Sequence, residues 1–169
     1  MAKVVYLIEN DISTDVIYPG RFMATVLPTE TPQFAFADDA IFNGMLKNKQ
    51  VPPGSVLVAG ENFGCGSSRE QAVSTLKGHD LLIIARSVAR IFMQNAVNLG
   101  LNMVVAPGIE ASQGDDVEVR GDVVVNTTTG KTYPIEKLPQ ARQAIVDAGG
   151  LIAYARKRLM DQPAVAGRG

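Results

Sequence analysis

Residues 55–106 read SVLVAGENFGCGSSREQAVSTLKGHDLLIIARSVARIFMQNAVNLGLNMVVA, and the pattern of this stretch decides the fold. Three short apolar runs have the length of buried strands: 55–59, 81–85 and 102–106. Between them, segments 68–77 and 87–99 carry apolar residues at helical spacing. Strands that alternate with helices are typical of parallel sheets, so we predict an α/β core.

The ends of the two predicted helices are marked by residues with known preferences. Gly78 and Gly100 stand where C-terminal caps belong, because glycine adopts positive φ without strain. Ser87 is suited to cap the start of the second helix. At the first helix, Ser67 and Ser68 both satisfy the capping-box pattern. A helix has a single N-cap position, so at least one of these serines is available for another role.

The flanking sequence predicts further elements of both kinds. Val4 to Ile8 is expected to be a buried strand, and Ile41 to Leu46 a weak helix. After Pro107 the pattern predicts three short strands followed by two helices: 116–120, 123–126 and 131–135, then 138–148 and 151–160. We therefore expect a single α/β domain over 1–162, with a mostly parallel central sheet and additional short β-strands, and a flexible tail over 163–169.

Composition excludes several classes of protein. The chain has 169 residues and a net charge of -1, which argues against general affinity for nucleic acid or an anionic membrane. No apolar run is long enough for a membrane span, and the run before Glu9 is too short for a secretion signal, so a cytoplasmic location is expected. Cys65 is the single cysteine, so an internal disulfide and a cysteine-only metal or iron–sulfur site are excluded.

The turn between the first predicted strand and helix of this stretch has the composition of an anion site. Gly64 and Gly66 permit positive φ and close approach of other groups. A helix start offers unpaired N–H groups, and Arg69 adds a charged donor fork that suits a carboxylate or phosphate. The lysine of a P-loop and the third glycine of a dinucleotide fingerprint are missing. The pattern alone leaves ligand binding or catalysis and plain helix capping equally open.

The stretch Gly60 to Val73 resembles the signature of the small subunits of 3-isopropylmalate dehydratase and homoaconitase, relatives of the fourth domain of aconitase. Asp11 to Ile17 with Pro19 to Phe22, and Ala85 to Gly100, are similar to two further signatures of that family. The resemblance implies a swivelling β/β/α domain that binds no cofactor itself. It also implies a large partner subunit that holds a [4Fe–4S] cluster, in a heterodimer or heterotetramer.

The same resemblance implies an activity and a set of site residues. In the family, a malate derivative is isomerised by loss and return of water. Ser67 matches the catalytic base, acting as an alkoxide, and Asp15 matches an acidic residue that can orient Arg69. Arg69 matches a ligand of the substrate carboxylate, and Gly66 and Ser68 match neighbouring substrate-binding positions. No metal ligand is expected in this chain.

Substrate choice is expected to depend on the loop after Pro19-Gly20, which faces the variable group of the substrate in relatives. Phe22, Met23, Ala24 and Thr25 lie in that loop. Homoaconitases often place an arginine where Ala24 aligns, and alanine cannot bind an additional carboxylate. The resemblance therefore favours a 2-alkylmalate, and most specifically 3-isopropylmalate of leucine biosynthesis.

Several alternatives remain open at the level of sequence. Arg21 could turn toward the substrate, and Phe22 and Met23 could simply pack into the core. The chain could also be the small subunit of a homoaconitase or another malate-derivative hydro-lyase. In a different class, it could be a non-catalytic carboxylate-binding module that uses the same helix start.

Overall fold

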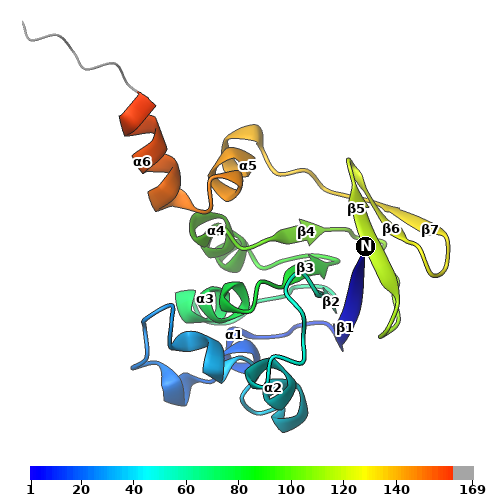
Figure 1. Ribbon diagram of the computed structural model, residues 1–169, viewed down its shortest axis with the longest axis horizontal. Coiled ribbons are helices and arrows are strands. Elements are labelled where there is room, and N and C mark those ends of the chain that lie inside the picture. Colours follow the sequence, from blue (N-terminus) through cyan, green and yellow to red (C-terminus); the bar gives the residue numbers. More distant parts are fainter. Residues whose placement is uncertain (162–169) are drawn as a thin grey trace, which may run out of the picture.

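The computed structural model describes residues 1–161, in which the strands form one seven-stranded sheet of order β4-β3-β2-β1-β5-β6-β7 (Figure 1). The strands are β1 (Ala2–Ile8), β2 (Val56–Ala59), β3 (Leu82–Ala85), β4 (Met103–Val105), β5 (Asp116–Arg120), β6 (Val123–Asn126) and β7 (Lys131–Pro134). The helices are α1 (Thr14–Ile17), α2 (Ala40–Lys47), α3 (Glu70–Gly78), α4 (Arg90–Leu99), α5 (Gln140–Asp147) and α6 (Leu151–Asp161), with 3-10 turns η1 (Gly20–Phe22) and η2 (Thr31–Phe34).

Strand β1 joins a parallel half of the sheet to an antiparallel half. It pairs with β2 in parallel, and β2, β3 and β4 continue in the same direction. Its other edge pairs with β5 in antiparallel fashion, with Ala2 opposite Val117, and β6 and β7 extend this half. The predicted parallel core with additional short strands is confirmed.

The two faces of the parallel sheet are covered differently. In β2, Leu57 and Ala59 pack into the core beneath helices α1 to α4. Val56 and Val58 point the other way and pack with Val117 and Val124. These two residues belong to the antiparallel ribbon, the name used here for strands β5, β6 and β7. The ribbon therefore folds back over the sheet face that the helices leave free (Figure 1), which produces β/β/α layers.

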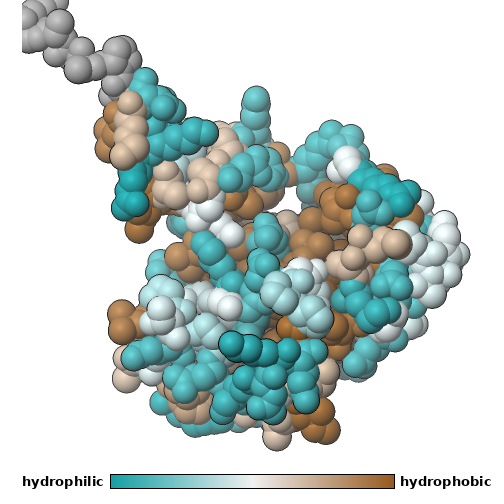
Figure 2. Space-filling model, in the orientation of Figure 1, coloured by the Kyte–Doolittle hydropathy of each residue, from teal (hydrophilic) through white to brown (hydrophobic). Residues whose placement is uncertain are grey.

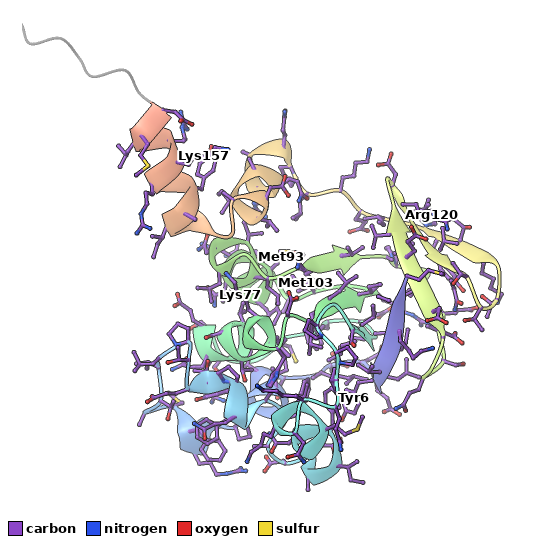
Figure 3. The ribbon with its side chains drawn as sticks, in the orientation of Figure 1. Tyr6, Lys77, Met93, Met103, Arg120 and Lys157 are labelled. Atoms are coloured by element: carbon purple, nitrogen blue, oxygen red, sulfur yellow. The ribbon has the colours of Figure 1, made fainter. Side chains whose placement is uncertain are left out.

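Tyr6 ties helix α2 to the middle of the sheet. Its ring stacks on Phe42 with centroids 3.8 Å apart, and its hydroxyl donates to Asp39 (Figure 3). Asp39 in turn caps α2 by accepting from the Phe42 N–H at 2.9 Å. The Phe42 N–H and the Tyr6 hydroxyl lower the pKa of Asp39, whereas burial of the phenol raises the pKa of Tyr6.

Gly100 has the predicted cap geometry, but Gly78 does not. Gly100 ends α4 with φ 69°. Gly78 is the last residue of α3, and the positive φ falls two residues later, at Asp80. A Cβ on Gly78 would lie 2.3 Å from Pro32 Cγ, so glycine is required there for close approach and not as a cap.

The predicted cap at Ser87 is also wrong. Helix α4 starts at Arg90, and its N-cap is Ala89, whose backbone is extended. Ser87 Oγ accepts instead from the N–H of Asn62 at 2.8 Å. The serine thus joins the loop after β3 to the loop after β2, a tertiary contact that competes with local capping.

The C-terminal elements agree with their predicted types. Helix α5 begins near the predicted position and α6 follows directly after Gly149 and Gly150. The flexible tail predicted over 163–169 lies outside the described residues, and the domain boundary at 162 stays a prediction. Within residues 1–161, the helices are too short or too polar to cross a membrane.

Candidate active site

The loops that follow β1 and β2 run side by side beyond the carboxyl end of the parallel sheet. Three backbone hydrogen bonds of 2.8 Å join them: Asp11 N to Glu61 O, Gly64 N to Ile12 O, and Thr14 N to Cys65 O. Carboxyl ends of adjacent parallel strands meet at one edge, which is where open α/β sheets bind ligands. Two stretches separated by about fifty residues in the sequence therefore form one surface.

The loop after β3 completes this surface through Phe63. The Phe63 N–H donates to the carbonyl of Ser87 at 3.1 Å, and its carbonyl accepts from the N–H of Ala89 at 2.9 Å. The Phe63 ring is fully buried and meets the ring of Phe92 edge-on, with centroids 5.2 Å apart. All three signature-like stretches identified in the sequence are thus brought together.

Two glycines shape the turn before α3. Gly64 has φ 78° and Gly66 has φ 92°, values that strain any residue with a Cβ. A Cβ on Gly64 would also lie 2.2 Å from Phe92 Cγ, whereas a Cβ on Gly66 would meet nothing closer than 3.6 Å. Glycine is therefore required at position 64 both for its positive φ and for close packing against Phe92. At position 66 it is required for its positive φ alone.

Neither serine of the turn caps α3. The N-cap position belongs to Arg69, and no side chain among the described residues caps this helix start. Ser67 and Ser68 lie before it and are exposed. The capping interpretation was wrong for both residues, because the helix begins later than the capping-box pattern predicts. Two exposed serines therefore stand at an uncapped, positively polarised helix end.

Arg69 is anchored beside these serines by Asp15 of α1. Arg69 Nη1 pairs with Asp15 Oδ1 and donates to the carbonyl of Tyr18 at 3.3 Å. The guanidinium lowers the pKa of the Asp15 carboxyl, which also accepts from the N–H of Gly20 at 3.2 Å. The Arg69 side chain is 15% exposed, and its Nε is buried without a hydrogen-bond partner in the part of the chain that the structure describes.

The expected specificity loop divides into packed and exposed residues. Phe22 stacks on Phe34 with centroids 4.1 Å apart, which matches the packing alternative for this side chain. Arg21 lies over the Phe22 ring and pairs with Asp38 at 2.5 Å, so its charge is engaged at the protein surface.

Met23, Ala24 and Thr25 continue the loop beyond Phe22. Met23 and Ala24 are exposed, and Thr25 is half-buried. The carbonyl of Thr25 accepts from the Tyr18 hydroxyl at 3.2 Å. Gln71, in the first turn of α3, donates to the carbonyl of Met23 at 3.3 Å, which links this loop to the helix start behind the serines.

Sequence reasoning missed three polar side chains that contact the site. Gln71 holds the loop at Met23, and Asn95 of α4 donates to the carbonyl of Ser68 at 3.3 Å. Thr14 Oγ1 lies 3.2 Å from Ser67 Oγ. Thr14 stands next to Asp15 in a signature-like stretch, which is the one sequence feature that could have drawn attention to it.

The described residues provide no set of side chains that fits an iron–sulfur cluster. Over residues 1–161, no three His, Cys, Asp or Glu side chains are grouped so as to hold a metal ion. Cys65 is half-buried, with its thiol directed at the carbonyl of Asp11 at 3.4 Å.

A groove lies away from the glycine turn. It has a volume of about 910 Å³ and is lined by residues of β4, α4, α5 and the ribbon, including Met93 and Met103 (Figure 3). Figure 2 shows apolar surface, in brown, where the molecule is hollowed beside α5. No residue of the 64–69 turn lines this groove. Within the turn, Gly66, Ser67 and Ser68 are exposed.

Comparison with known proteins identifies this arrangement of loops. Residues 10–106, which include the three site loops, match the aconitase C-terminal domain family. A crystal structure of a 3-isopropylmalate dehydratase from Methanocaldococcus jannaschii has a TM-score of 0.84, with 40% identity over 94% of both chains. The fold is thus that of an aconitase-type C-terminal domain.

Relatives known from sequence narrow the class further. The isopropylmalate/citramalate isomerase small subunit of Methanocaldococcus jannaschii is 39% identical over 93% of this chain and 94% of its own. The 3-isopropylmalate dehydratase small subunit of Heliobacterium modesticaldum is 40% identical over 93% of this chain and 95% of its own. The chain belongs to the family of 3-isopropylmalate dehydratase small subunits.

Proposed function

We propose that this chain is the small subunit of a hydro-lyase that isomerises 3-isopropylmalate, or a close 2-alkylmalate, by removing water and adding it back. One observation carries the proposal: two exposed serines stand at an uncapped helix start beside an arginine that Asp15 anchors. Family membership supports the same activity. Such an enzyme serves leucine biosynthesis, and we place it in the cytoplasm.

Each part of the turn meets a need of the reaction. Ser67 Oγ takes a proton from the carbon that will become unsaturated, and it later returns the proton to the double bond. Arg69 and the free N–H groups at the start of α3 hold a substrate carboxylate. A free serine is too weakly acidic to ionise in water. The positive end of α3 and the Arg69 charge favour the ionised form of Ser67.

The remaining parts of the reaction must come from another chain. Hydroxide departs readily only with the help of a Lewis acid, and the described residues of this chain do not fit a metal cluster. We propose that a large subunit carries a [4Fe–4S] cluster and supplies this group. Its surface would close over the open serine turn and enclose the substrate; both a heterodimer and a heterotetramer meet this requirement.

The specificity loop favours an alkyl group on the substrate. Met23 is half exposed and apolar, and Ala24 offers no charge to an additional carboxylate. Arg21 carries a positive charge at the start of this loop, but its guanidinium is paired with Asp38. A 2-alkylmalate therefore suits the loop better than the tricarboxylates of a homoaconitase.

The test uses the assembled two-chain enzyme and the Ser67→Ala variant. We expect wild-type enzyme to turn over 3-isopropylmalate, and Ser67→Ala to lower kcat by at least about a thousandfold, the scale seen when a base or nucleophile is removed. Gel filtration should show unchanged association with the large subunit. Ser112→Ala, which alters an exposed serine outside the site, should retain full turnover.

Other outcomes would redirect the assignment. Near-normal turnover by Ser67→Ala would remove this residue from the role of base. Turnover of a tricarboxylate in preference to isopropylmalate would support a homoaconitase. Tight binding of malate derivatives to the isolated chain by calorimetry, with no requirement for a partner, would instead support a carboxylate-binding module.

A further inference from the structure

The hydroxyl group of Thr14 lies buried against the serine that the proposed function makes the base. Thr14 is 1% exposed and is the first residue of α1. Its Oγ1 lies 3.1 Å from the carbonyl oxygen of Ser67 and 3.2 Å from Ser67 Oγ. Two acceptors on one residue thus stand within reach of a single threonine proton.

The backbone of Thr14 fixes this position. Its N–H donates to the carbonyl of Cys65 at 2.8 Å, and its carbonyl accepts from the N–H of Tyr18 at 2.8 Å. The main chain is therefore held on the serine turn on one side and within α1 on the other. The hydroxyl hydrogen remains free to turn about the Cβ–Oγ1 bond, because rotation of a hydroxyl hydrogen leaves the heavy atoms in place.

A threonine hydroxyl has one proton to donate and lone pairs to accept. When Ser67 is neutral, Thr14 donates to the Ser67 carbonyl and accepts the proton of Ser67 Oγ, so every group is satisfied. When Ser67 is ionised, its Oγ becomes the stronger acceptor. A hydrogen bond to an ionised oxygen is about twice as strong as a neutral one, so the Thr14 proton turns toward it.

Two neighbouring side-chain donors are directed at groups other than Ser67 Oγ. Arg69 Nη1 is occupied by Asp15 and by the carbonyl of Tyr18, and Asn95 donates to the carbonyl of Ser68. In the described part of the chain, Thr14 is the one side chain that forms a hydrogen bond with Ser67 Oγ. Because Thr14 is buried, water does not replace its hydroxyl readily, and the hydrogen bond is strengthened by the low local dielectric.

We propose that Thr14 is a positioning residue for the Ser67 base: its hydroxyl donates to the ionised Oγ and turns back to the Ser67 carbonyl once Oγ is protonated. The inference rests on the proposed function, in which Ser67 is the base. The substrate proton passes to Ser67 Oγ, and the electron pair of the broken C–H bond stays with the substrate. Thr14 keeps its own proton on Oγ1 throughout and changes only its acceptor.

The experiment compares Thr14→Val and Thr14→Ser in the assembled two-chain enzyme, with 3-isopropylmalate as substrate. Thr14→Val keeps the branched shape and removes the donor, so kcat should fall by about a hundredfold while KM changes by less than about threefold, the scale for removing a donor that stabilises negative charge. The isotope effect of substrate deuterated at the abstracted position should rise, because proton abstraction becomes slower. Thr14→Ser should restore most of kcat.

Thr75→Val is the matched control for loss of a buried threonine hydroxyl. Thr75 is fully buried in α3 and its Oγ1 donates to the carbonyl of Thr31 at 2.8 Å, away from Ser67. This variant should lower the melting temperature as Thr14→Val does, but it should leave kcat and the isotope effect unchanged. A purely structural role for Thr14 would make the two variants behave alike.

Every outcome bears on the proposal. A kcat within about twofold of wild type in Thr14→Val, a change confined to KM, or failure of Thr14→Ser to restore kcat would overturn it. If Thr14→Val does not assemble, the smaller Thr14→Ala replaces it. Failure of both to assemble would make the hydroxyl a folding element and overturn the catalytic inference. Near-normal turnover by Ser67→Ala would refute the base assignment itself, which the Thr14 results alone do not address.

Discussion

Asp15 holds Arg69 in one orientation while remaining largely exposed itself, at 59% of its side-chain surface. Asp15→Asn keeps the size of the side chain but removes its charge, so Arg69 loses its anchor. We expect kcat/KM for 3-isopropylmalate to fall by about tenfold, which corresponds to about 1.4 kcal/mol of transition-state binding. The melting temperature should also fall, because the Arg69 side chain is only 15% exposed and would lose its charged partner.

Glu118→Gln is the control for this variant. It removes a solvent-accessible ion pair, between Glu118 and Arg120 of β5, which are not among the site residues. Its kcat/KM should equal that of wild type. An equal loss in both variants would show that the effect of Asp15→Asn is not specific to Arg69.

Ala24 is the residue at which substrate class can be tested directly. Ala24→Arg adds a guanidinium that can bind a further carboxylate, so the ratio of kcat/KM should shift toward tricarboxylates and away from 3-isopropylmalate. Parallel assays of both substrates measure this ratio. Thr29→Arg, which adds the same charge at another exposed position farther along the chain, should leave the ratio unchanged. The same ratio in all three proteins would show that the loop does not contact the variable group.

Single residues also show where sequence reasoning reaches its limit. Ser67, Arg69 and Asp15 lie within recognisable motifs, and the structure places them on one surface. Thr14 and Asn95 also lie within signature-like stretches, but no local pattern predicts that their side chains contact the serine turn. Their contacts depend on how α1 and α4 pack, and this is determined by distant parts of the chain.

At the scale of elements, the sharp turn between β2 and α3 depends on Gly64 packing under α4. Gly64→Ala combines backbone strain at φ 78° with a clash against the Phe92 ring. We expect a loss of about 2–5 kcal/mol in the free energy of unfolding, from about 1–2 for left-handed backbone and about 1–3 for overpacking. Denaturant unfolding measures this change.

Gly130→Ala separates the two contributions at Gly64. Gly130 has φ 76°, close to that of Gly64, and a Cβ there would meet nothing within 4 Å. Its alanine variant should therefore lose only the backbone part, about 1–2 kcal/mol. Equal losses in the two variants would mean that Phe92 moves aside without cost.

Local periodicity predicted the types of most elements but not all of their ends. The apolar runs of β2, β3 and β4 and the helical spacing of α3 and α4 were sufficient to assign them. The predicted helix caps at Gly78 and Ser87 were wrong. Pro32 packs closely against Gly78, and the N–H of Asn62 binds Ser87, although both partners are far away in sequence. Local preferences cannot anticipate a tertiary partner that outcompetes a cap.

At the scale of the whole molecule, α6 adds little to the packed core. No residue of α6 is buried, and Leu151, Ile152, Leu159 and Met160 are exposed. Removing residues 151–169 should therefore lower the melting temperature by no more than about 4 °C, equivalent to about 1 kcal/mol for a chain of this size. Calorimetry of the truncated chain measures this shift.

A longer truncation provides the contrast. Removing residues 140–169 also deletes α5 and the Gly149 carbonyl to which Lys77 donates at 3.0 Å (Figure 3). This truncated protein should have a clearly lower melting temperature than the full chain, because α5 no longer packs against α4. Loss of cooperative unfolding in the shorter truncation would show that α6 belongs to the folding core.

The order of the strands was beyond the reach of sequence patterns. Alternation of strand and helix predicted the parallel half, but nothing local to β1 indicates that it lies between β2 and β5. Its partners are Val56 to Ala59 on one edge and Asp116 and Val117 on the other. Such pairing depends on the closure of long loops, which periodicity does not encode.

The central position of β1 has a consequence for how the protein is made. The ribosome releases β1 early in synthesis, yet its second partner strand emerges more than a hundred residues later. Until then, the nascent chain carries an apolar strand with an unpaired edge, the kind of surface that promotes aggregation. Long-range pairing also slows folding. Production of this subunit should therefore depend on chaperone capacity and growth temperature, independently of the chemistry at the serine turn.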